Sequence, residues 1–422
     1  MEKQTDKGKG NSGKKKTAVL LFSGGLDTST IAKWLSVEKG WEIVTLTLDV
    51  GQQDDLKKVP ARAKECGAKS HLTLDVKKEF VSSYIVPAIK ANALYQGIYP
   101  VGTSIARPLM AKKAVEFAKK VGATAIAHGC TGKGNDQVRF DIIVKSLAPE
   151  MQVLVPVREW NMGRDQEAEY LKKHGIPVDL KKSQFSVDEN FWGRSAECGV
   201  LEDPWQEPPE DAFGWTSPAG AAPEKPSYVR INFEKGVPVS VEEEGTGKKA
   251  KGALETIIFL NKLAGLHGIG RLDHMEDRVV GLKSREVYEY PAATVLISAH
   301  KDLEKFTNTA SVNNFKEVVD SKWAYLAYSG LWTEPLMDAL NAFIDSVNET
   351  VTGTVRVKLH KGHSSIVGRK SPNAIYDYNL ASYNIDSKFD QKMSVGFIEL
   401  WGLQTRMANA IGSPKNKRDR KK

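Results

Sequence analysis

The feature that most constrains the fold is an alternation of strand-like and helix-like segments over residues 17–160. Residues 18–22 form a continuous apolar run of strand length, and Ile31, Trp34 and Leu35 follow it at helical spacing. Further strand signals lie at residues 41–50, 72–76, 123–128 and 152–155. Strands that alternate with helices imply a parallel sheet covered by helices on both faces. This part of the chain is therefore predicted to be a doubly wound α/β domain, with ligands bound beyond the carboxyl ends of its strands.

Glycine and proline mark the ends of the helical segments in this region. Gly40 is expected to close the first helix, and a charged helix ends at Cys66 and Gly67. Pro108 is expected to begin a helix that stops at Gly122, because proline is favoured in the first turn of a helix.

The pattern changes after about residue 200. Residues 202–226 hold six of the eighteen prolines and are too irregular for regular secondary structure. Residues 229–233 and 237–241 then predict a hairpin that turns at Lys235 and Gly236. The second half of the chain is therefore predicted to be α+β, with no internal repeat.

The rest of the second half mixes helices with short strands. Residues 254–264 predict an amphipathic helix. Short strands are expected at residues 295–299, 355–359 and 365–368. The apolar stretch 396–411 predicts a strand or helix, which serves either as an oligomer contact or as a final part of the core.

The net charge of +8 is concentrated at the two ends of the chain. Residues 1–16 carry +4 and residues 413–422 carry +5, which leaves −1 on residues 17–412. A near-neutral body is not the footprint of a nucleic-acid-binding fold. The ends are therefore predicted to be disordered, solubilising tails, with contact to RNA as the alternative.

Composition excludes several other classes of protein. No apolar run approaches the roughly 20 residues of a membrane span, and the lysine-rich start does not resemble a signal peptide. The cysteines at 66, 130 and 198 form no C-x-x-C pair, which excludes a disulfide framework and predicts a reducing, cytoplasmic setting. His360 and His363 flank a Lys-Gly turn and are expected at the surface, not as metal ligands.

The strongest local motif is SGGLDTS at residues 23–29, between the first strand and the first helix. Gly24 and Gly25 allow the backbone to approach a ligand closely, and the helix start supplies free N–H groups, so the motif predicts a phosphate site. Asp27 would repel phosphate unless Mg²⁺ or a substrate amine lies beside it. The alternative is an ordinary helix cap.

This motif is neither of the two common phosphate loops. No G-x-G-x-x-G follows the first strand, and Gly132-Lys133 is followed by Gly134, so there is no P-loop. The run is instead similar to the pyrophosphatase loop of enzymes that split ATP into AMP and pyrophosphate.

Two further runs lie at strand-to-helix junctions. Residues 102–108 read GTSIARP, and residues 128–140 read HGCTGKGNDQVRF. Glycines with Thr, Lys, Asn, Asp and Arg can hold phosphates and a zwitterion together. A solvated loop that caps a helix at Asn135 or Asp136 is the alternative for the second run.

These runs, with SVDENFWGRS at residues 186–195 and GLKSREVYE at residues 281–289, closely resemble the argininosuccinate synthase family. The resemblance extends from about Ala18 to Gly402, and HG-x-TGKGNDQVRF is far more specific than the shared loop. Cys130 stands where the family usually has alanine, which raises the question of redox sensitivity, and the basic ends are not part of the family pattern.

The resemblance implies an enzyme that joins citrulline and aspartate at the expense of MgATP. Citrullyl-adenylate would form with release of pyrophosphate, and aspartate would then displace AMP to give argininosuccinate. It also implies a homotetramer, and a domain division into a basic tail at 1–16, a nucleotide-binding domain at 17–183, an α+β synthetase domain at 184–395, an oligomerisation arm at 396–412 and a basic tail at 413–422.

The resemblance also implies the site residues. ATP is expected at Leu21, Phe22, Ser23, Gly24, Gly25, Leu26, Asp27, Thr28, Ser29, Leu48 and Gly129. Aspartate is expected at Thr131, Asn135 and Asp136. Citrulline is expected at Tyr99, Ser104, Asn135, Arg139, Ser186, Ser195, Glu276 and Tyr288. Asp27 and Lys133 are the expected catalytic residues, through charge alone, and the only metal implied is Mg²⁺ with ATP, near Asp27.

Several of these residues have a structural alternative. Leu48 suits a core strand, Tyr288 suits a strand, and Glu276 suits a solvated charge beside Arg278. Residues 186–189 read as a helix capping box.

Two other functions remain open on the sequence. One is a tRNA-modifying or nucleotide-amidating ATP pyrophosphatase, although the chain has neither the cysteine pairs nor the amidase domain of the thiolating and glutamine-dependent members. The other is a non-catalytic protein held on RNA by its basic ends.

Overall fold

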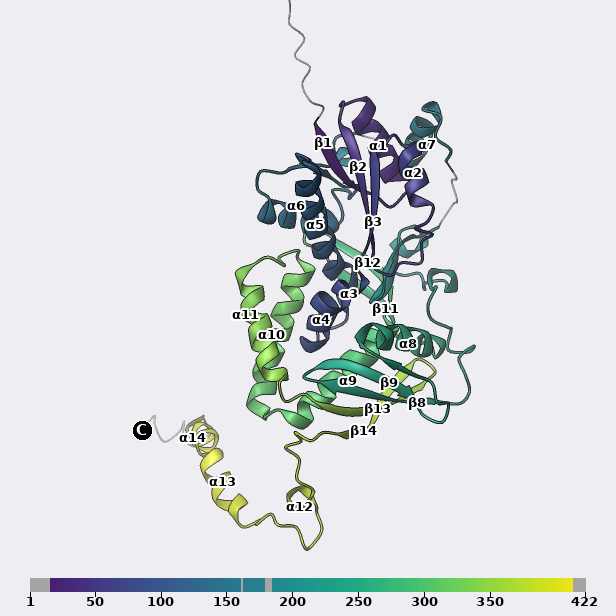
Figure 1. Cartoon of the computed structure of the whole chain (residues 1–422). Helices are drawn as coiled ribbons and strands as arrows, with labels where there is room; N and C mark the ends of the chain where they lie inside the picture. The colour runs from purple at the N-terminus through teal and green to yellow at the C-terminus, as the bar shows by residue number, and fades with distance from the viewer. Residues whose placement is uncertain (1–15, 161, 179–183, 413–422) are drawn as a thin grey trace, which may run out of the picture. The chain divides into compact units, whose positions relative to one another are not determined.

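The computed structural model describes residues 16–160, 162–178 and 184–412 (Figure 1). The chain divides into one compact unit that ends at Asn373 and a second that begins at Ala374. The predicted basic tails fall outside the described residues, apart from Lys16.

The first unit begins with a parallel five-stranded sheet. Its strands are β1 (Thr17–Leu21), β2 (Glu42–Asp49), β3 (Ser70–Asp75), β4 (Ala125–Ala127) and β5 (Gln152–Leu154). They are arranged in the order β3-β2-β1-β4-β5, and all neighbouring pairs are parallel. The order reverses direction between β1 and β4. Parallel α/β sheets bind their ligands at such a reversal.

Helices cover both faces of this sheet, which confirms the doubly wound prediction (Figure 1). Along β1, Val19 faces one core, and its neighbours Ala18 and Leu20 face the other. Helices α1 (Leu26–Val37), α2 (Val59–Glu65) and α7 (Arg164–Lys173) pack on the second core. The first core contains α5 (Gly102–Val121) and α6 (Asp136–Leu147), and the short segments α3 (Lys77–Phe80), a π-helical turn (Val81–Ile85) and α4 (Val86–Lys90).

Helix α5 corrects the prediction that Pro108 starts a helix. The helix begins at Gly102, and Pro108 lies inside it. Ser104, Ile105 and Ala106 precede the proline and are buried, so packing stabilises the first turns although Pro108 cannot donate a backbone hydrogen bond. The early start places Ser104 on the helix itself.

Two antiparallel sheets follow. One has the order β10-β9-β8-β13-β14 and the other the order β11-β12-β7-β6. The strands of the first are β8 (Ser227–Glu234), β9 (Val237–Glu243), β10 (Lys249–Lys251), β13 (Gly353–His360) and β14 (His363–Lys370). The strands of the second are β6 (Ser186–Asn190), β7 (Gly193–Glu197), β11 (Arg271–Asp277) and β12 (Lys283–Glu289). The helices of this part are α8 (Ala253–Leu266), α9 (Pro291–Thr307), α10 (Ala310–Tyr328) and α11 (Pro335–Asn348).

The predicted hairpin between residues 229 and 241 is confirmed as β8–β9. Lys235 and Gly236 have φ angles of 48° and 77°, as a tight hairpin turn requires. Lys361 and Gly362 form the same kind of turn between β13 and β14, with His360 paired to His363.

Residues 295–299 belong to helix α9, so the predicted strand there is wrong. Val295, Leu296 and Ala299 are fully buried and lie on a helix that begins with Pro291 at its first position. A short apolar run buried on all sides does not show which periodicity it follows. The capping-box alternative at residues 186–189 is also wrong, because these residues form strand β6.

The second unit is helical in its last part. Its helices are α12 (Tyr378–Ala381), α13 (Met393–Trp401) and α14 (Leu403–Gly412). The structure thus decides between the strand and helix alternatives for residues 396–411. Phe397, Leu400 and Trp401 are exposed on α13. The role of this arm in oligomerisation remains a prediction.

Gly193 is a position where the fold tolerates no side chain. A Cβ atom there would overlap Cε1 and Cδ1 of Tyr290, a buried ring with edge contact to Tyr99. We expect Gly193→Ala to lower the free energy of unfolding by about 1–3 kcal/mol, as overpacking of a core does. Urea denaturation would measure the loss. Gly220→Ala is the matched control, since its Cβ meets nothing within 4 Å. Equal denaturation midpoints for the two variants would contradict the prediction.

Candidate active site

A cavity of about 670 Å³ lies at the reversal point of the parallel sheet. Nine of the residues predicted to bind ATP line it: Leu21, Phe22, Ser23, Gly25, Leu26, Asp27, Thr28, Leu48 and Gly129. The two remaining members of the predicted set, Gly24 and Ser29, do not line the cavity. Ser29 is buried and accepts a hydrogen bond from Arg62 Nε at 3.1 Å. Its hydroxyl also donates to the Gly24 carbonyl at 3.4 Å, so it holds the loop in place.

The loop between β1 and α1 leaves the helix start open to a ligand. Gly24 has a φ of 81°, which an L side chain rarely adopts, and Gly25 caps α1 without a side-chain hydrogen bond. The hydroxyls of Ser23 and Thr28 lie 3.1 Å apart at its rim. The first N–H groups of a helix have no partner within the helix and carry positive partial charge. This geometry suits a phosphate group.

The walls of the cavity combine apolar side chains with charged side chains of both signs. Leu48 is 3% exposed and belongs to the core, and it also lines the cavity, so its two interpretations are compatible. Arg107, Arg164 and Arg194 bring guanidinium groups to the wall, although Arg194 is paired with Glu289 at 2.8 Å. Sequence reasoning assigned no role to these three arginines.

The loop after β4 is held at its start by a hydrogen-bonded chain. The backbone N–H of Cys130 donates to His128 Nδ1 at 3.2 Å, and His128 Nε2 lies 2.8 Å from Asp141. Asp141 in turn pairs with Arg158 at 2.9 Å. Burial raises the pKa of the Cys130 thiol. The residue is half-buried and lines the nucleotide cavity, and its redox sensitivity stays a prediction.

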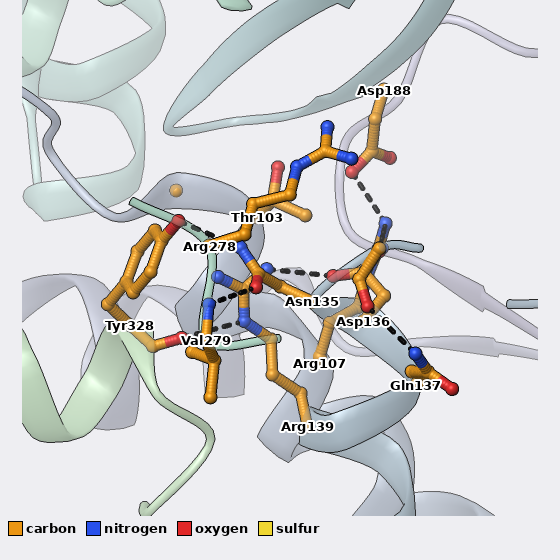
Figure 2. A network of polar contacts seen from close by, with 12 residues as sticks. Thr103, Arg107, Asn135, Asp136, Gln137, Arg139, Asp188, Arg278, Val279 and Tyr328 are labelled. Carbon is orange, nitrogen blue, oxygen red and sulfur yellow. Dashed lines mark hydrogen bonds and ion pairs between the residues drawn. The ribbon is translucent and has the colours of Figure 1, made fainter. Parts of the chain in front are cut away.

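Asp136 is held between two arginines (Figure 2). Arg107 Nε donates to one of its carboxylate oxygens and Arg139 Nη1 to the other, both at 2.8 Å. Burial opposes ionisation of Asp136, but the two guanidinium groups outweigh it and lower the pKa of the carboxyl. Arg107 also pairs with Asp188 at 2.6 Å. Asp136 is therefore a carboxylate whose two oxygens have fixed directions.

Glu276 lies at the centre of a cluster of tyrosines. It is 2% exposed, and its two oxygens accept hydrogen bonds from the hydroxyls of Tyr288 and Tyr328, each at 2.7 Å. Tyr99 stacks on Tyr288 at 4.4 Å between ring centroids. Within the described part of the chain, no cationic side chain pairs with Glu276. A buried carboxylate of this kind favours a cationic ligand group.

Two polar groups beside this cluster are buried without a hydrogen-bond partner. They are Arg139 Nη2 and Ser104 Oγ. Buried polar groups are nearly always paired in native proteins, so these two are candidates for contact with a ligand. A carboxylate would satisfy both the guanidinium and the hydroxyl.

The structure brings together most of the predicted amino-acid-binding residues. Tyr99, Ser104, Asn135, Asp136, Arg139, Glu276 and Tyr288 are linked through direct contacts or one shared neighbour. Ser195 pairs in register with Tyr288 across β7 and β12. Thr131 and Lys133 lie exposed on their loop, and Ser186 is exposed at the start of β6. None of these three has a side-chain contact with the others among the hydrogen bonds of the described residues.

Tyr328 is the site residue that sequence reasoning missed most completely. It is the last residue of α10, and it contacts Asn135, Arg139 and Glu276. No motif surrounds it in the sequence. Arg107 and Asp188, in contrast, stand within runs that the sequence analysis singled out, so their motifs could have indicated them.

A second group of charges lies beside the cluster, around Arg278. Its guanidinium pairs with Glu197 at 2.5 Å and with Glu286 at 3.2 Å, and it donates to the backbone carbonyl of Lys133 at 3.3 Å. Burial raises the pKa of Glu286 to about 8, with a further contribution from Glu276 and Glu197. Arg278 thus links the turn between β11 and β12 to the loop after β4.

This raised pKa predicts a dependence of stability on pH. Folded Glu286 binds its proton up to about pH 8, whereas the ordinary value is 4.5, so the free energy of unfolding falls as pH rises between these values. Glu286→Gln has no proton to lose there, and we expect its unfolding temperature to fall less between pH 6 and pH 8.5. Thermal unfolding at the two pH values would measure this, with the exposed Glu169→Gln as control. Identical pH dependence in Glu286→Gln and the parent protein would contradict the prediction.

Comparison with known proteins agrees with this geometry. The parallel sheet, the open helix start and the cavity at the reversal point define a nucleotide-binding α/β enzyme. The family model described as "Arginosuccinate synthase N-terminal HUP domain" matches residues 17–177, and "Arginosuccinate synthase C-terminal domain" matches residues 185–408. The chain belongs to the argininosuccinate synthase family of ATP-dependent ligases.

Individual relatives extend over nearly the whole chain. Argininosuccinate synthase of Pyrococcus furiosus is 57% identical over 92% of this chain and 93% of its own length. The enzyme of Halalkalibacterium halodurans is 50% identical over 97% of this chain and 98% of its own. That of Geobacillus kaustophilus is 50% identical over 93% and 96%, respectively. Among the described residues, no helix has the length and apolar character needed to cross a membrane.

Proposed function

We propose that the chain joins L-citrulline to L-aspartate with ATP, and forms argininosuccinate, AMP and pyrophosphate through a citrullyl-adenylate. The observation that carries this proposal is the pair of unsatisfied buried groups, Arg139 Nη2 and Ser104 Oγ, beside the buried carboxylate of Glu276, which has no ion pair among the described residues. An α-amino acid has a carboxylate for the first two and an ammonium group for the third. The site adjoins the cavity of the nucleotide loop, which Arg107 also lines.

The reaction needs ATP because a ureido carbonyl is a poor electrophile. In the first step the ureido oxygen attacks the α-phosphorus, the bond from that phosphorus to the bridging oxygen breaks, and pyrophosphate leaves. In the second step the aspartate amine attacks the activated carbon, the bond from carbon to the phosphate oxygen breaks, and AMP leaves. Both steps depend on positioning and charge stabilisation. The amine loses a proton to solvent in the second step.

The residues take the following roles in this proposal. The start of α1 and Gly24 and Gly25 hold the phosphates, and Leu48 packs beside adenine. Lys133 stabilises the charge on the departing pyrophosphate. Asp136 orients the aspartate amine, with Thr131 and Asn135 on the aspartate carboxylate. Citrulline lies against Tyr99, Ser104, Asn135, Arg139, Ser186, Ser195, Glu276 and Tyr288.

We propose that Mg²⁺ enters with ATP and that Asp27 lies near it. Among residues 16–160, 162–178 and 184–412, no group of three or more His, Cys, Asp or Glu side chains is arranged to hold a metal ion. Mg²⁺ does not need such a group, because it keeps several waters and binds through substrate phosphates and one or two carboxylates. Asp27, exposed in the first turn of α1, is suitably placed for that role. The bound ion would neutralise phosphate charge.

The proposal extends to organisation and setting. We propose a cytoplasmic homotetramer in which the arm at 396–412 makes subunit contacts, in line with the exposed apolar side chains of α13. The boundary between the domains at 17–183 and 184–395 is also part of the proposal, and the two family models meet between residues 177 and 185.

Pyrophosphate release from MgATP tests the proposed reaction. It would be measured with citrulline alone, with aspartate alone, with both and with neither. We expect release to require citrulline, and sustained turnover to require aspartate as well. Release that does not depend on citrulline would contradict the proposal and indicate another acceptor for the adenylyl group.

A further inference from the structure

The hydroxyl of Tyr328 lies between two of the proposed substrate-binding residues, Asn135 and Glu276. Figure 2 shows its contact with Asn135. It is 2.8 Å from Asn135 Nδ2 and 2.7 Å from Glu276 Oε1, and the side chain is 1% exposed. Tyr328 comes from α10, whereas Asn135 precedes α6 and Glu276 lies on β11. A single hydroxyl thus links three elements that are distant in the sequence.

The hydrogen bonds from Asn135 to Tyr328 and from Tyr328 to Glu276 allow only one arrangement of donors and acceptors. A carboxylate only accepts, and a tyrosine hydroxyl has one proton, so Tyr328 donates to Glu276. Burial and the nearby Glu276 raise the pKa of Tyr328, and the hydroxyl therefore keeps this proton. Its lone pair then accepts from Asn135, which must present Nδ2 and not Oδ1 toward the tyrosine.

The other end of the Asn135 amide is fixed as well. Its Oδ1 accepts a hydrogen bond from the backbone N–H of Val279 at 2.8 Å. The amide is therefore held from both sides in one orientation, with Nδ2 using one of its two N–H groups on Tyr328. The second N–H is left for a ligand. Asn135 is 8% exposed, so a flipped amide would leave buried groups unpaired on both sides.

The ring of Tyr328 is itself anchored. It stacks on Tyr95 at 3.5 Å between centroids, with an angle of 3° between the ring planes. The Arg139 guanidinium lies 5.0 Å from the ring centroid, and Arg139 Nε donates to the Tyr328 carbonyl at 3.0 Å. These contacts hold the Tyr328 side chain in place, and they also fix the position of Arg139.

We propose that Tyr328 is a positioning residue that sets the polarity of the Asn135 amide, so that the site presents an N–H donor to the carboxylate or ureido oxygen of its amino-acid substrates. This inference rests on the proposed function, which places Asn135 against both citrulline and aspartate. It predicts a role for α10 in substrate affinity that does not involve ATP.

Tyr328→Phe removes the hydroxyl and keeps the ring. We expect the KM values for citrulline and aspartate to rise by about 10- to 100-fold, the loss typical of a hydrogen bond to a charged or buried group. The KM for ATP should stay within about twofold, because none of the contacts of Tyr328 within the described part of the chain reaches the nucleotide loop. Tyr325→Phe is the matched control, since Tyr325 lies one turn earlier on α10 and is 47% exposed. Unchanged KM values for both amino acids, or an equal rise for ATP, would overturn the inference.

A second variant tests the same amide from its other end and does not disturb the core. Val279 lies second in a tight turn in which the Gly281 N–H donates to the Arg278 carbonyl at 2.9 Å. Proline is favoured at this position of a turn, and Val279→Pro removes the N–H that holds Asn135 Oδ1. We expect it to raise the same two KM values. If the Tyr328→Phe protein fails to fold, unaltered amino-acid KM values in Asn135→Asp, which lacks the N–H donor itself, would still overturn the inference.

Pyrophosphate release by the parent enzyme distinguishes a failure of this inference from a failure of the proposed function. If parent pyrophosphate release does not require citrulline, the proposed function fails. If release requires citrulline and neither variant changes the amino-acid KM values, the role of Tyr328 fails. Asn135→Asp puts an acceptor in place of the donor, and Tyr328→Phe should add little to its loss, because residues that act through one interaction are not additive. Additive losses would contradict the link between the two residues.

Discussion

Lys133→Ala is expected to slow citrulline-dependent release of pyrophosphate by about 100- to 1,000-fold, the usual cost of removing one preorganised charge from a transition state. The loop after β4 brings Gly129 and Cys130 to the wall of the nucleotide cavity, and Lys133 follows three residues later. No ion pair or side-chain hydrogen bond of this lysine occurs in the described chain, and its backbone is held by Arg278. Its ammonium group is therefore available to a departing phosphate.

The measurement is a single-turnover assay of pyrophosphate release with saturating citrulline. Lys133 is exposed, so the variant should keep the unfolding temperature of the parent protein. Lys145→Ala, at an exposed lysine of α6, is the matched control and should release pyrophosphate at the parent rate. Normal release in Lys133→Ala would show that another group stabilises the leaving pyrophosphate.

Asp136→Asn is expected to slow the second step strongly while it spares much of the first. The change keeps the shape of the side chain but removes the charge shared by Arg107 and Arg139, and it replaces one carboxylate oxygen by an N–H that repels an amine. We expect turnover with aspartate to fall by about 100-fold or more, since misplacing a reacting group by about 1 Å can cost that much in rate. Pyrophosphate release in the first turnover should fall much less.

Comparing the two partial reactions decides the role of Asp136. Rapid quench of the first turnover gives adenylation, and steady-state formation of AMP gives the complete reaction. Asp165→Asn, at an exposed carboxylate in the first turn of α7, is the control and should alter neither. Equal losses in both partial reactions would mean that Asp136 serves the structure of the site and not the amine.

The parallel sheet could be predicted from the sequence because its strands are short, apolar and separated by glycine-marked helices. The same reasoning was wrong at residues 295–299, because this part of α9 is almost entirely buried and offers no polar face to reveal its period. It was wrong at Pro108 because packing of Ser104 and Ile105 outweighs a local preference. Local signals therefore predicted the elements whose two faces differ in polarity, or whose ends are marked.

Some parts of the candidate site could likewise be predicted from the sequence, and others could not. Its loops at residues 23–29 and 128–135 could be found because a phosphate site needs glycines in a short run. The cluster around Glu276 could be predicted only through resemblance to a family, and Tyr328 by neither route. Its role depends on where α10 ends in space, and no residue beside it in the sequence carries that information.

The wide spacing of the site along the chain has a consequence for synthesis on the ribosome. Asn135 and Tyr328 lie 193 positions apart. At about 5–20 residues per second, roughly 10 to 40 s pass between the emergence of one and of the other. The glycine-rich loop of the nascent chain is therefore exposed to cellular ATP well before the amino-acid site can close. A polypeptide that terminates before Tyr328 contains that loop but lacks part of the acceptor site, so every competent enzyme has completed translation of α10.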